Sequence, residues 1–234
     1  VIDYLSIHHY ERPDAFEEGP RRYEAFFEET ARLIAASAHP QLKVYVSEWN
    51  AQSTDWRTGL YCGGLLNAFE RCGAFLEIGG PALFLRHTSA TDWDNAFINF
   101  NEQSWFPAPN YVVMKLWRAH YAPDRIAIEG DAGRLNLVAT KSADGTTCHV
   151  KAVNPSDEDQ PLRLNVAGDY QVSTSELQLV APGSLSARNS LEQPAAVRPE
   201  PGAVDVTESR VQVTLPARSA AVVTIQLVPI RKPG

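Results

Sequence analysis

The stretch "KVYVSEWNAQST", residues 43–54, places a carboxylate, an indole and an amide directly after a short apolar run. Glu48 is a candidate nucleophile or general acid/base, although a strand-end glutamate can also cap a helix or pair with an arginine. Trp49 and Asn50 favour a sugar ligand, because an indole face stacks on sugar rings and an amide hydrogen-bonds to hydroxyl groups. The cluster therefore predicts chemistry or binding on carbohydrate.

A second polar cluster, "SIHHYE", follows the apolar start of the chain. Tyr10 could donate a hydrogen bond that keeps a carboxylate ionised and oriented, or it could be a half-buried tyrosine at a sheet rim. His8 and His9 are adjacent and would point to opposite faces of a strand. They therefore do not predict a metal pair, and at most one of them can face a site.

A third cluster, "LRHTSATDWDN", contains Trp93 and Asn95 as further candidates for contacts with a sugar. Asp92 and Asp94 could chelate a cation, but no ordered series of Asp and Asn residues follows them, as Ca²⁺ would require. The sequence contains neither a G-x-S-x-G motif nor a phosphate loop or dinucleotide fingerprint. We therefore expect an enzyme or binding module without metal or cofactor.

The composition excludes several other classes of partner. The net charge is −7, the pI is about 5.4, and no run of Lys or Arg is present, so nucleic acid and anionic membranes are not expected partners. No apolar run is long enough to span a bilayer. The three cysteines, Cys62, Cys72 and Cys148, lack metal-ligand spacing and favour reduced thiols. They slightly favour a cytoplasmic location, which otherwise stays open.

The elements that must position these clusters fall into two regions, because all Trp and Phe residues lie at or before Trp117. In the first region, apolar runs alternate with segments of helical periodicity, which predicts parallel strands with helical crossovers. The expected strands are residues 1–7, 42–48 and 81–88, and the expected helices are residues 20–37, 55–73 and 109–121. In such folds the carboxyl ends of the strands form the site.

The second region is rich in Val, Leu, Thr, Ala and Pro and contains turn signals between short alternating runs. This pattern predicts an antiparallel β-sandwich, with residues 182–205 as a long surface loop. The expected strands are residues 124–130, 134–142, 146–154, 161–167, 170–180, 210–216 and 220–228. We expect one domain over residues 1–122 and another over residues 123–234.

Several separate blocks of sequence resemble one known family. "DYLSIHHY", "VYVSEWN", "GLLNAFER" and "WDNAFINF…WFPAPNYVVMKLW" resemble the C-terminal half of the family-51 glycoside hydrolases, the α-L-arabinofuranosidases. The tail "NSLEQPAAVRP…VTLPARSAAVVTIQL" is similar to the last strands of that family's sandwich. The resemblance implies a (β/α)₈ TIM barrel followed by a β-sandwich, with this chain holding barrel strands six to eight and the sandwich.

The resemblance also implies roles for individual residues. Glu48 matches the nucleophile of a retaining hydrolase, Tyr10 matches the tyrosine that orients it, and His8 matches an inward histidine. Asn95 falls near a family amide that contacts the furanose, although that residue is often Gln. Relatives often carry an aromatic residue shortly after the nucleophile, a place that only Trp56 could fill here.

One part of this machinery is not in the sequence. A retaining mechanism needs a second carboxyl group about 5 Å from the first. In the family this group is a Glu after an Asn at the end of the fourth strand, which would precede Val1, and the only Asn-Glu pair here, at Asn101, follows the eighth strand. Because the chain also begins inside a strand-like run, we expect a piece of a longer protein.

The expected substrate is an arabinose-containing carbohydrate, and the expected partner is the rest of the barrel, from an upstream segment or a second chain. A homo-oligomer is compatible with the sequence. Two alternatives stay open: another barrel glycosidase, such as an endoglucanase or β-xylosidase, or a non-catalytic carbohydrate-binding fragment. An Asn-Glu pair at a strand end upstream of Val1 would favour the enzyme over the binding fragment.

Overall fold

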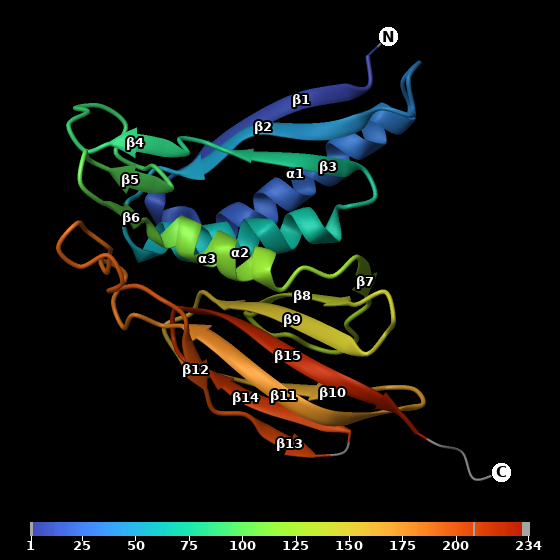
Figure 1. Cartoon of the computed structure of the whole chain (residues 1–234). Coiled ribbons are helices and arrows are strands. Elements are labelled where there is room, and N and C mark those ends of the chain that lie inside the picture. Colours follow the sequence, from blue (N-terminus) through green and yellow to red (C-terminus); the bar gives the residue numbers. More distant parts are fainter. Residues whose placement is uncertain (1, 208, 231–234) are drawn as a thin grey trace.

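The computed structural model describes residues 2–207 and 209–230. Val1, in the first predicted strand, and Glu208 and residues 231–234, in the second predicted domain, lie outside it. Figure 1 shows three layers: a parallel sheet, a layer of helices and a β-sandwich. The first part of the chain contains β1 (Tyr4–Glu11), the 3₁₀ helix η1 (Pro13–Phe16), α1 (Glu18–Ala35), β2 (Lys43–Ala51), α2 (Trp56–Arg71), β3 (Leu76–Pro81), β4 (Leu85–His87), β5 (Ile98–Phe100), β6 (Trp105–Pro107) and α3 (Pro109–Ala119).

The second part contains only strands: β7 (Asp124–Ile126), β8 (Asn136–Lys141), β9 (Thr147–Asn154), β10 (Gln160–Asn165), β11 (Tyr170–Val180), β12 (Glu200–Gly202), β13 (Asp205–Thr207), β14 (Arg210–Leu215) and β15 (Ser219–Pro229). They form a six-stranded sheet of order β12-β11-β15-β9-β8-β7 and a three-stranded sheet of order β10-β14-β13. All their pairings are antiparallel. The predicted sandwich is confirmed. The predicted loop over 182–205 is mostly irregular but includes β12 and the first residue of β13, two strands that were not predicted.

The first sheet has the order β1-β2-β3, and both of its pairings are parallel, as predicted. The described part of the chain contains three strands of this sheet and no closed barrel. The predicted position of the third strand, residues 81–88, is wrong. The strand is instead "LEIGGP", because Gly79 and Gly80 permit a close approach that a bulkier apolar run would prevent.

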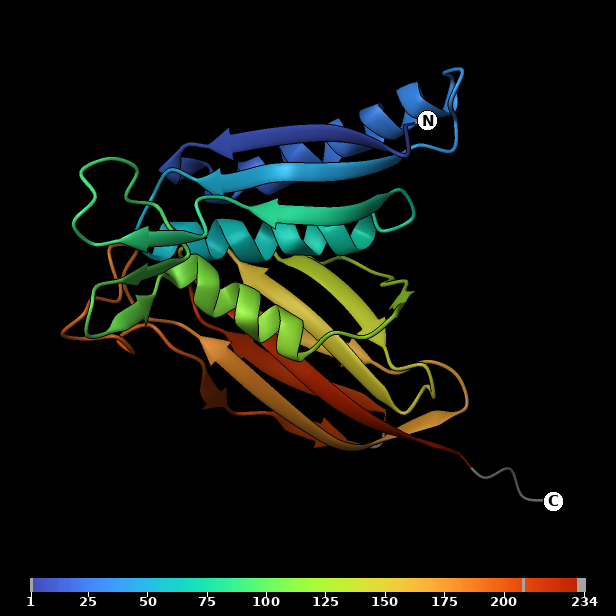
Figure 2. The ribbon, with the colours of Figure 1, turned by 45° about the horizontal axis from the view of Figure 1, so that its top comes forward.

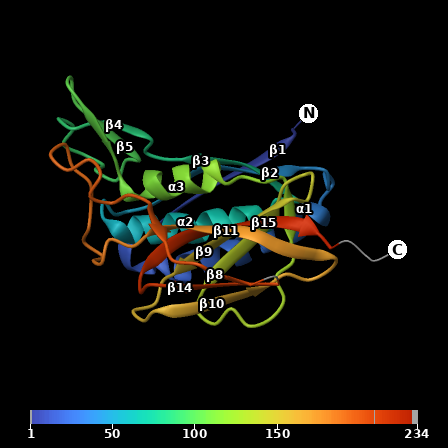
Figure 3. The same cartoon turned by 60° about the horizontal axis from the view of Figure 1, so that its bottom comes forward.

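Residues 81–88 contribute to a separate small sheet. Its strands β4 and β5 are parallel, and β5 and β6 are antiparallel. Figures 2 and 3 show this sheet at one end of the molecule, beside the segment that leads from β11 toward β12. Asn189 of that segment donates from Nδ2 to the Pro107 carbonyl oxygen at 2.9 Å, which fixes the segment against β6.

Helix α2 lies between the parallel sheet and the sandwich (Figure 1). It begins after Asp55, the N-cap, whose carboxylate accepts a hydrogen bond from the Arg57 backbone N–H. A Cβ added at Gly63 would lie 2.8 Å from Val153, and one at Gly64 would lie 2.8 Å from Pro20. These glycines therefore let α2 contact the sandwich and α1 at short range.

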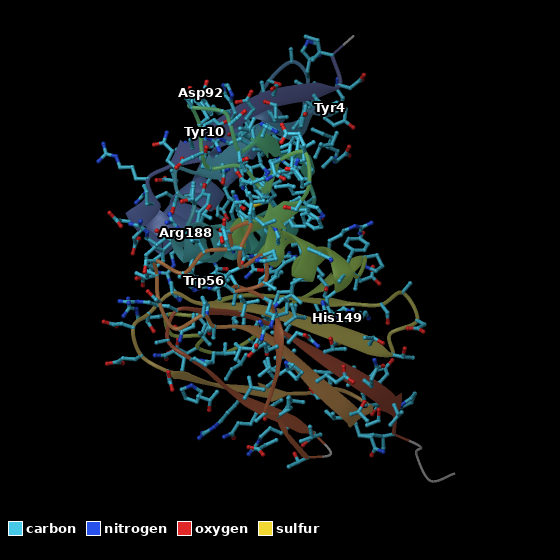
Figure 4. All side chains as sticks on the ribbon, turned by 60° about the vertical axis from the view of Figure 1, so that its left-hand side comes forward. Tyr4, Tyr10, Trp56, Asp92, His149 and Arg188 are labelled. Carbon is cyan, nitrogen blue, oxygen red and sulfur yellow. The ribbon has the colours of Figure 1, made fainter. Side chains whose placement is uncertain are left out.

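A buried polar network joins α2 to the sandwich. The Lys151 ammonium group is fully buried and donates to Oε1 of Glu70, whose Oε2 has no hydrogen-bond partner within the described residues. Burial raises the pKa of Glu70 and lowers that of Lys151. Beside this pair, Trp117 Nε1 donates to Asn67 Oδ1 at 2.8 Å. Figure 4 shows Trp56 at the same interface, where its Nε1 donates to the Arg218 carbonyl oxygen of the sandwich at 2.6 Å.

The three cysteines are free and buried. Across the described residues, no helix combines the length and the apolar character needed to cross a membrane.

We predict that Lys151→Ala destabilises the protein by about 3–5 kcal/mol, because it leaves the Glu70 carboxylate buried without its counter-charge. The measurement is the free energy of unfolding in urea. Lys141→Ala, on the neighbouring strand, is the matched control and should change that free energy by no more than about 0.5 kcal/mol. Replacing both partners with methionine should recover most of the loss, and equal stability of Lys151→Ala and wild type would contradict the prediction.

Candidate active site

One extra residue in β2 decides which side chains reach the candidate site. Along β1 and β2, Ile7 pairs with Val46 but His8 pairs with Glu48, so Ser47 has no partner and forms a β-bulge. Val44 and Val46 are fully buried. Regular alternation would place position 48 on the same buried face. The bulge reverses this alternation and turns Glu48 to the face of the sheet that points away from the helices.

Neighbouring groups hold the bulge in place. The Ser6 hydroxyl donates to Ser47 Oγ at 2.8 Å, and Ser47 Oγ in turn donates to the Ile7 carbonyl oxygen at 3.2 Å. On the other side, a Cβ at Gly80 would lie 2.9 Å from the Ser47 carbonyl oxygen. The bulge therefore requires a residue without a side chain at position 80.

The carboxylate of Glu48 is the centre of a small polar cluster. Tyr10 donates from its hydroxyl to Glu48 Oε2 at 2.8 Å, and Nδ1 of His8 lies 3.6 Å from the same oxygen. The three side chains come from the carboxyl-terminal parts of adjacent parallel strands, as expected of a site in this type of fold. Burial raises the pKa of Tyr10 to about 12, with further contributions from the hydrogen bond to Glu48 and from its charge.

Trp93 extends this cluster. Its ring lies edge-on to Tyr10, with 6.0 Å between ring centroids, and 62% of the residue is exposed. Arg86 donates to the Ala90 and Asp92 carbonyl oxygens, which holds the loop that carries the indole. Figure 4 shows Tyr10 and Asp92 at the same end of the sheet, opposite Tyr4. A cavity adjoins this loop, lined by Leu83, Leu85, Arg86, His87, Ala90, Asp92 and Trp93.

The expectation that Trp49 stacks on a sugar is wrong. Only 1% of Trp49 is exposed, and its ring packs edge-on against Phe69 and Phe97, with centroid distances of 5.6 and 5.4 Å. The physical reason is the bulge at Ser47, because the residue after Glu48 then faces the helices. Trp56, the other candidate aromatic residue, is fully buried against the sandwich.

The expectation that Asn50 and Asn95 contact a sugar is also wrong, because both are buried in one network of amides. Asn50 donates from Nδ2 to the Asn95 carbonyl oxygen at 2.7 Å and accepts at Oδ1 from Asn110 Nδ2 at 3.2 Å. Asn95 donates from Nδ2 to the Ala51 carbonyl oxygen at 3.2 Å. These amides position the end of β2 against the loop that carries Trp93 and against the start of α3.

Sequence reasoning missed other polar groups on the exposed face of the sheet and at its edge. Tyr4 donates from its hydroxyl to Glu77 Oε2 at 2.7 Å. Glu11 is buried at the end of β1 and accepts hydrogen bonds from Arg22. Burial raises the pKa of Glu11, but the hydrogen bonds with His9 and Arg22 outweigh this effect and lower the pKa. The only signal for these pairs was the alternation of polar residues along β1, which does not identify partners. No cluster of three or more potential metal ligands occurs within the described residues.

Comparisons with known proteins identify the family of the chain. The sequence profile of the alpha-L-arabinofuranosidase C-terminal domain family matches residues 39–219. The chain belongs to this family. An intracellular exo-alpha-L-arabinofuranosidase from Bacteroides ovatus is 30% identical over 132 residues, which is 51% of this chain and 25% of that protein. The matched part of this chain therefore spans about a quarter of the length of this curated relative.

Solved structures show the same fold. The family-51 α-L-arabinofuranosidase from Thermotoga petrophila RKU-1 aligns with a TM-score of 0.82 at 17% identity, over 97% of this chain and 53% of that one. The arabinose complex of α-L-arabinofuranosidase from Thermotoga maritima aligns with a TM-score of 0.81 at 17% identity and the same coverages. The fold of this arabinofuranosidase-family chain is thus the C-terminal portion of the family-51 architecture.

We predict that Gly80→Ala destabilises the protein by about 1–3 kcal/mol, because its Cβ would press on a backbone oxygen that cannot move without disturbing the bulge. Urea unfolding measures the effect. Gly73→Ala is the matched control, since its Cβ would meet no atom closer than 3.4 Å. Unchanged stability of Gly80→Ala relative to this control would show that the bulge does not depend on Gly80.

We predict that Glu48→Gln lowers the pKa of Tyr10 from about 12 toward its ordinary value of 10. Removal of the negative charge makes the phenolate less unfavourable, whereas the remaining burial still raises the pKa. Titration of ¹³C-labelled tyrosine rings by NMR measures the change, and the signal missing from Tyr10→Phe gives the assignment. A Tyr10 pKa that is the same in both proteins would contradict the contact.

Proposed function

We propose that this chain carries the nucleophile of a retaining exo-α-L-arabinofuranosidase. The observation that carries the proposal is the hydrogen bond of 2.8 Å from Tyr10 to Glu48 on the exposed face of the parallel sheet. The family membership supports an arabinofuranosidase over the other barrel glycosidases and over a binding fragment, and the curated relative is named for exo-acting arabinofuranosidase activity. The substrate would be an arabinose-containing oligosaccharide or polysaccharide with terminal α-L-arabinofuranosyl residues.

In the proposed reaction, Glu48 attacks the anomeric carbon and displaces the aglycone oxygen, which gives a covalent glycosyl-enzyme that water then hydrolyses. Tyr10 holds Oε2 of the carboxylate, so that Oε1, which makes no hydrogen bond within the described residues, is the attacking atom. His8, 3.6 Å from Oε2, and the exposed indole of Trp93 are the proposed contacts with the sugar.

The second carboxyl group, which protonates the leaving oxygen, would come from residues outside this sequence. The acidic residue of the only Asn-Glu pair, Glu102, lies in the turn between β5 and β6, where its Oε1 is 3.4 Å from His87. We therefore assign it no part in the reaction. The proposed partner is the rest of the barrel, which would add the strand with the acid/base to the exposed face of the sheet.

We predict that Glu48→Ala, in the complete enzyme, lowers hydrolysis of an aryl α-L-arabinofuranoside by at least about a thousandfold, because the covalent step is lost. Sodium azide should restore part of the turnover and give a glycosyl azide of inverted configuration, since the anion attacks from the side that Glu48 occupied. Product configuration is read by NMR.

Glu77→Gln is the matched control, because Glu77 is a carboxylate of the same sheet that pairs with Tyr4 at the opposite end of β1 from Tyr10. It should retain activity within about twofold of wild type, as expected of a group that does not touch the reacting atoms. A retained azide product from Glu48→Ala would assign Glu48 as the acid/base instead, and full activity of Glu48→Ala would refute the proposal.

A further inference from the structure

A second cavity shares no lining residue with the Glu48 cluster and lies where α1 and α2 face the segment from β7 to β8 (Figure 1). Its volume is about 450 Å³, which falls within the range of about 300–1,000 Å³ for small-molecule sites. It is lined by Arg21, Glu24, Arg71, Arg125, Ile126, Ala127, Ile128, Gly130, Ala132, Leu135, Asn136, Leu137, Val138 and Ala139. The lining thus combines three guanidinium groups with one carboxylate and an apolar wall.

Arg71 forms the rigid part of this cavity. It donates from Nε and Nη2 to the two carboxylate oxygens of Glu24 at 2.6 and 2.5 Å. Its Nη1 donates to Asn136 Oδ1 at 3.0 Å and to the Leu137 carbonyl oxygen at 2.7 Å. Arg71 and Glu24 therefore pair with each other and join α1 and α2 to β8.

Arg21 and Arg125 are exposed to solvent and have no such partner. Neither side chain makes an ion pair or a hydrogen bond with any described residue. Arg21 comes from α1 and Arg125 from β7, so the two charges reach the cavity from different layers of the fold. The side chains that line the cavity carry three positive charges and one negative charge, and the acidic residues Asp124, Glu129 and Asp131 of the β7–β8 segment do not line it.

We propose that this cavity binds a small oxyanion, with Arg21 and Arg125 as its ligands. A guanidinium group presents two parallel N–H donors that match a carboxylate or phosphate group. Ile126 and Leu137 on the same wall offer apolar contact to a ring that bears the anion. The ligand is therefore either the carboxylate of a uronic-acid sugar or free inorganic phosphate, and the two share the chemistry that the arginines recognise.

Isothermal titration calorimetry on the protein tests this proposal with three probes: digalacturonate, inorganic phosphate and neutral galactobiose. We expect saturable binding of at least one anion and none of galactobiose at this cavity. Arg21→Gln/Arg125→Gln should weaken that binding at least tenfold. Arg163→Gln, which removes the same charge from an exposed position on β10, should leave the affinity unchanged.

Tighter binding of digalacturonate than of phosphate identifies the sugar acid as the ligand, and the reverse order identifies phosphate. Arg125→Lys keeps the charge and removes the paired donors, and it should give an intermediate affinity. The proposal is overturned if neither anion binds saturably, or if the double variant binds as tightly as Arg163→Gln. Glu48→Gln should bind the anion as wild type does, so this test is independent of the proposed glycosidase activity.

Discussion

The bulge at Ser47 is the constraint on which the candidate site depends. An extra residue in β2 shifts the alternation of its side chains, so Glu48 leaves the face that Val44 and Val46 bury and joins the face of Tyr10. The same shift sends Trp49 into the helix layer. A strand of uniform register would bury the carboxylate among aromatic rings, where an unpaired charge is costly.

Helix α2 connects the parallel sheet and its helices to the sandwich. Its glycines allow close contact with α1 and β9, and its polar residues, among them Asn67 and Glu70, bond to groups of the sandwich and α3. Buried polar pairs of this kind contribute little net stability, but a different packing would leave them unpaired. They therefore fix one relative position of the helix layer and the sandwich, and with it the position of the strands above.

The two faces of the parallel sheet differ, because helices cover only one of them. The helices cover one side of the sheet, whereas the other side presents Tyr10, Glu48 and the apolar Ile78 to solvent. The outer edge of β1 also pairs with no described strand. Exposed apolar groups and open strand edges normally require cover. This surface supports the proposal that further barrel strands complete the site.

The sequence alone determined the three helices and the parallel and antiparallel classes of sheet, because these follow from local periodicity. It also identified Glu48 and Tyr10 as neighbours at strand ends. It could not determine the faces of Trp49 and Asn50 or the position of β3. The faces of Trp49 and Asn50 depend on the bulge at Ser47, and a one-residue bulge leaves no local pattern because tertiary contacts across three strands stabilise it. The position of β3 depends on the close approach at Gly79 and Gly80.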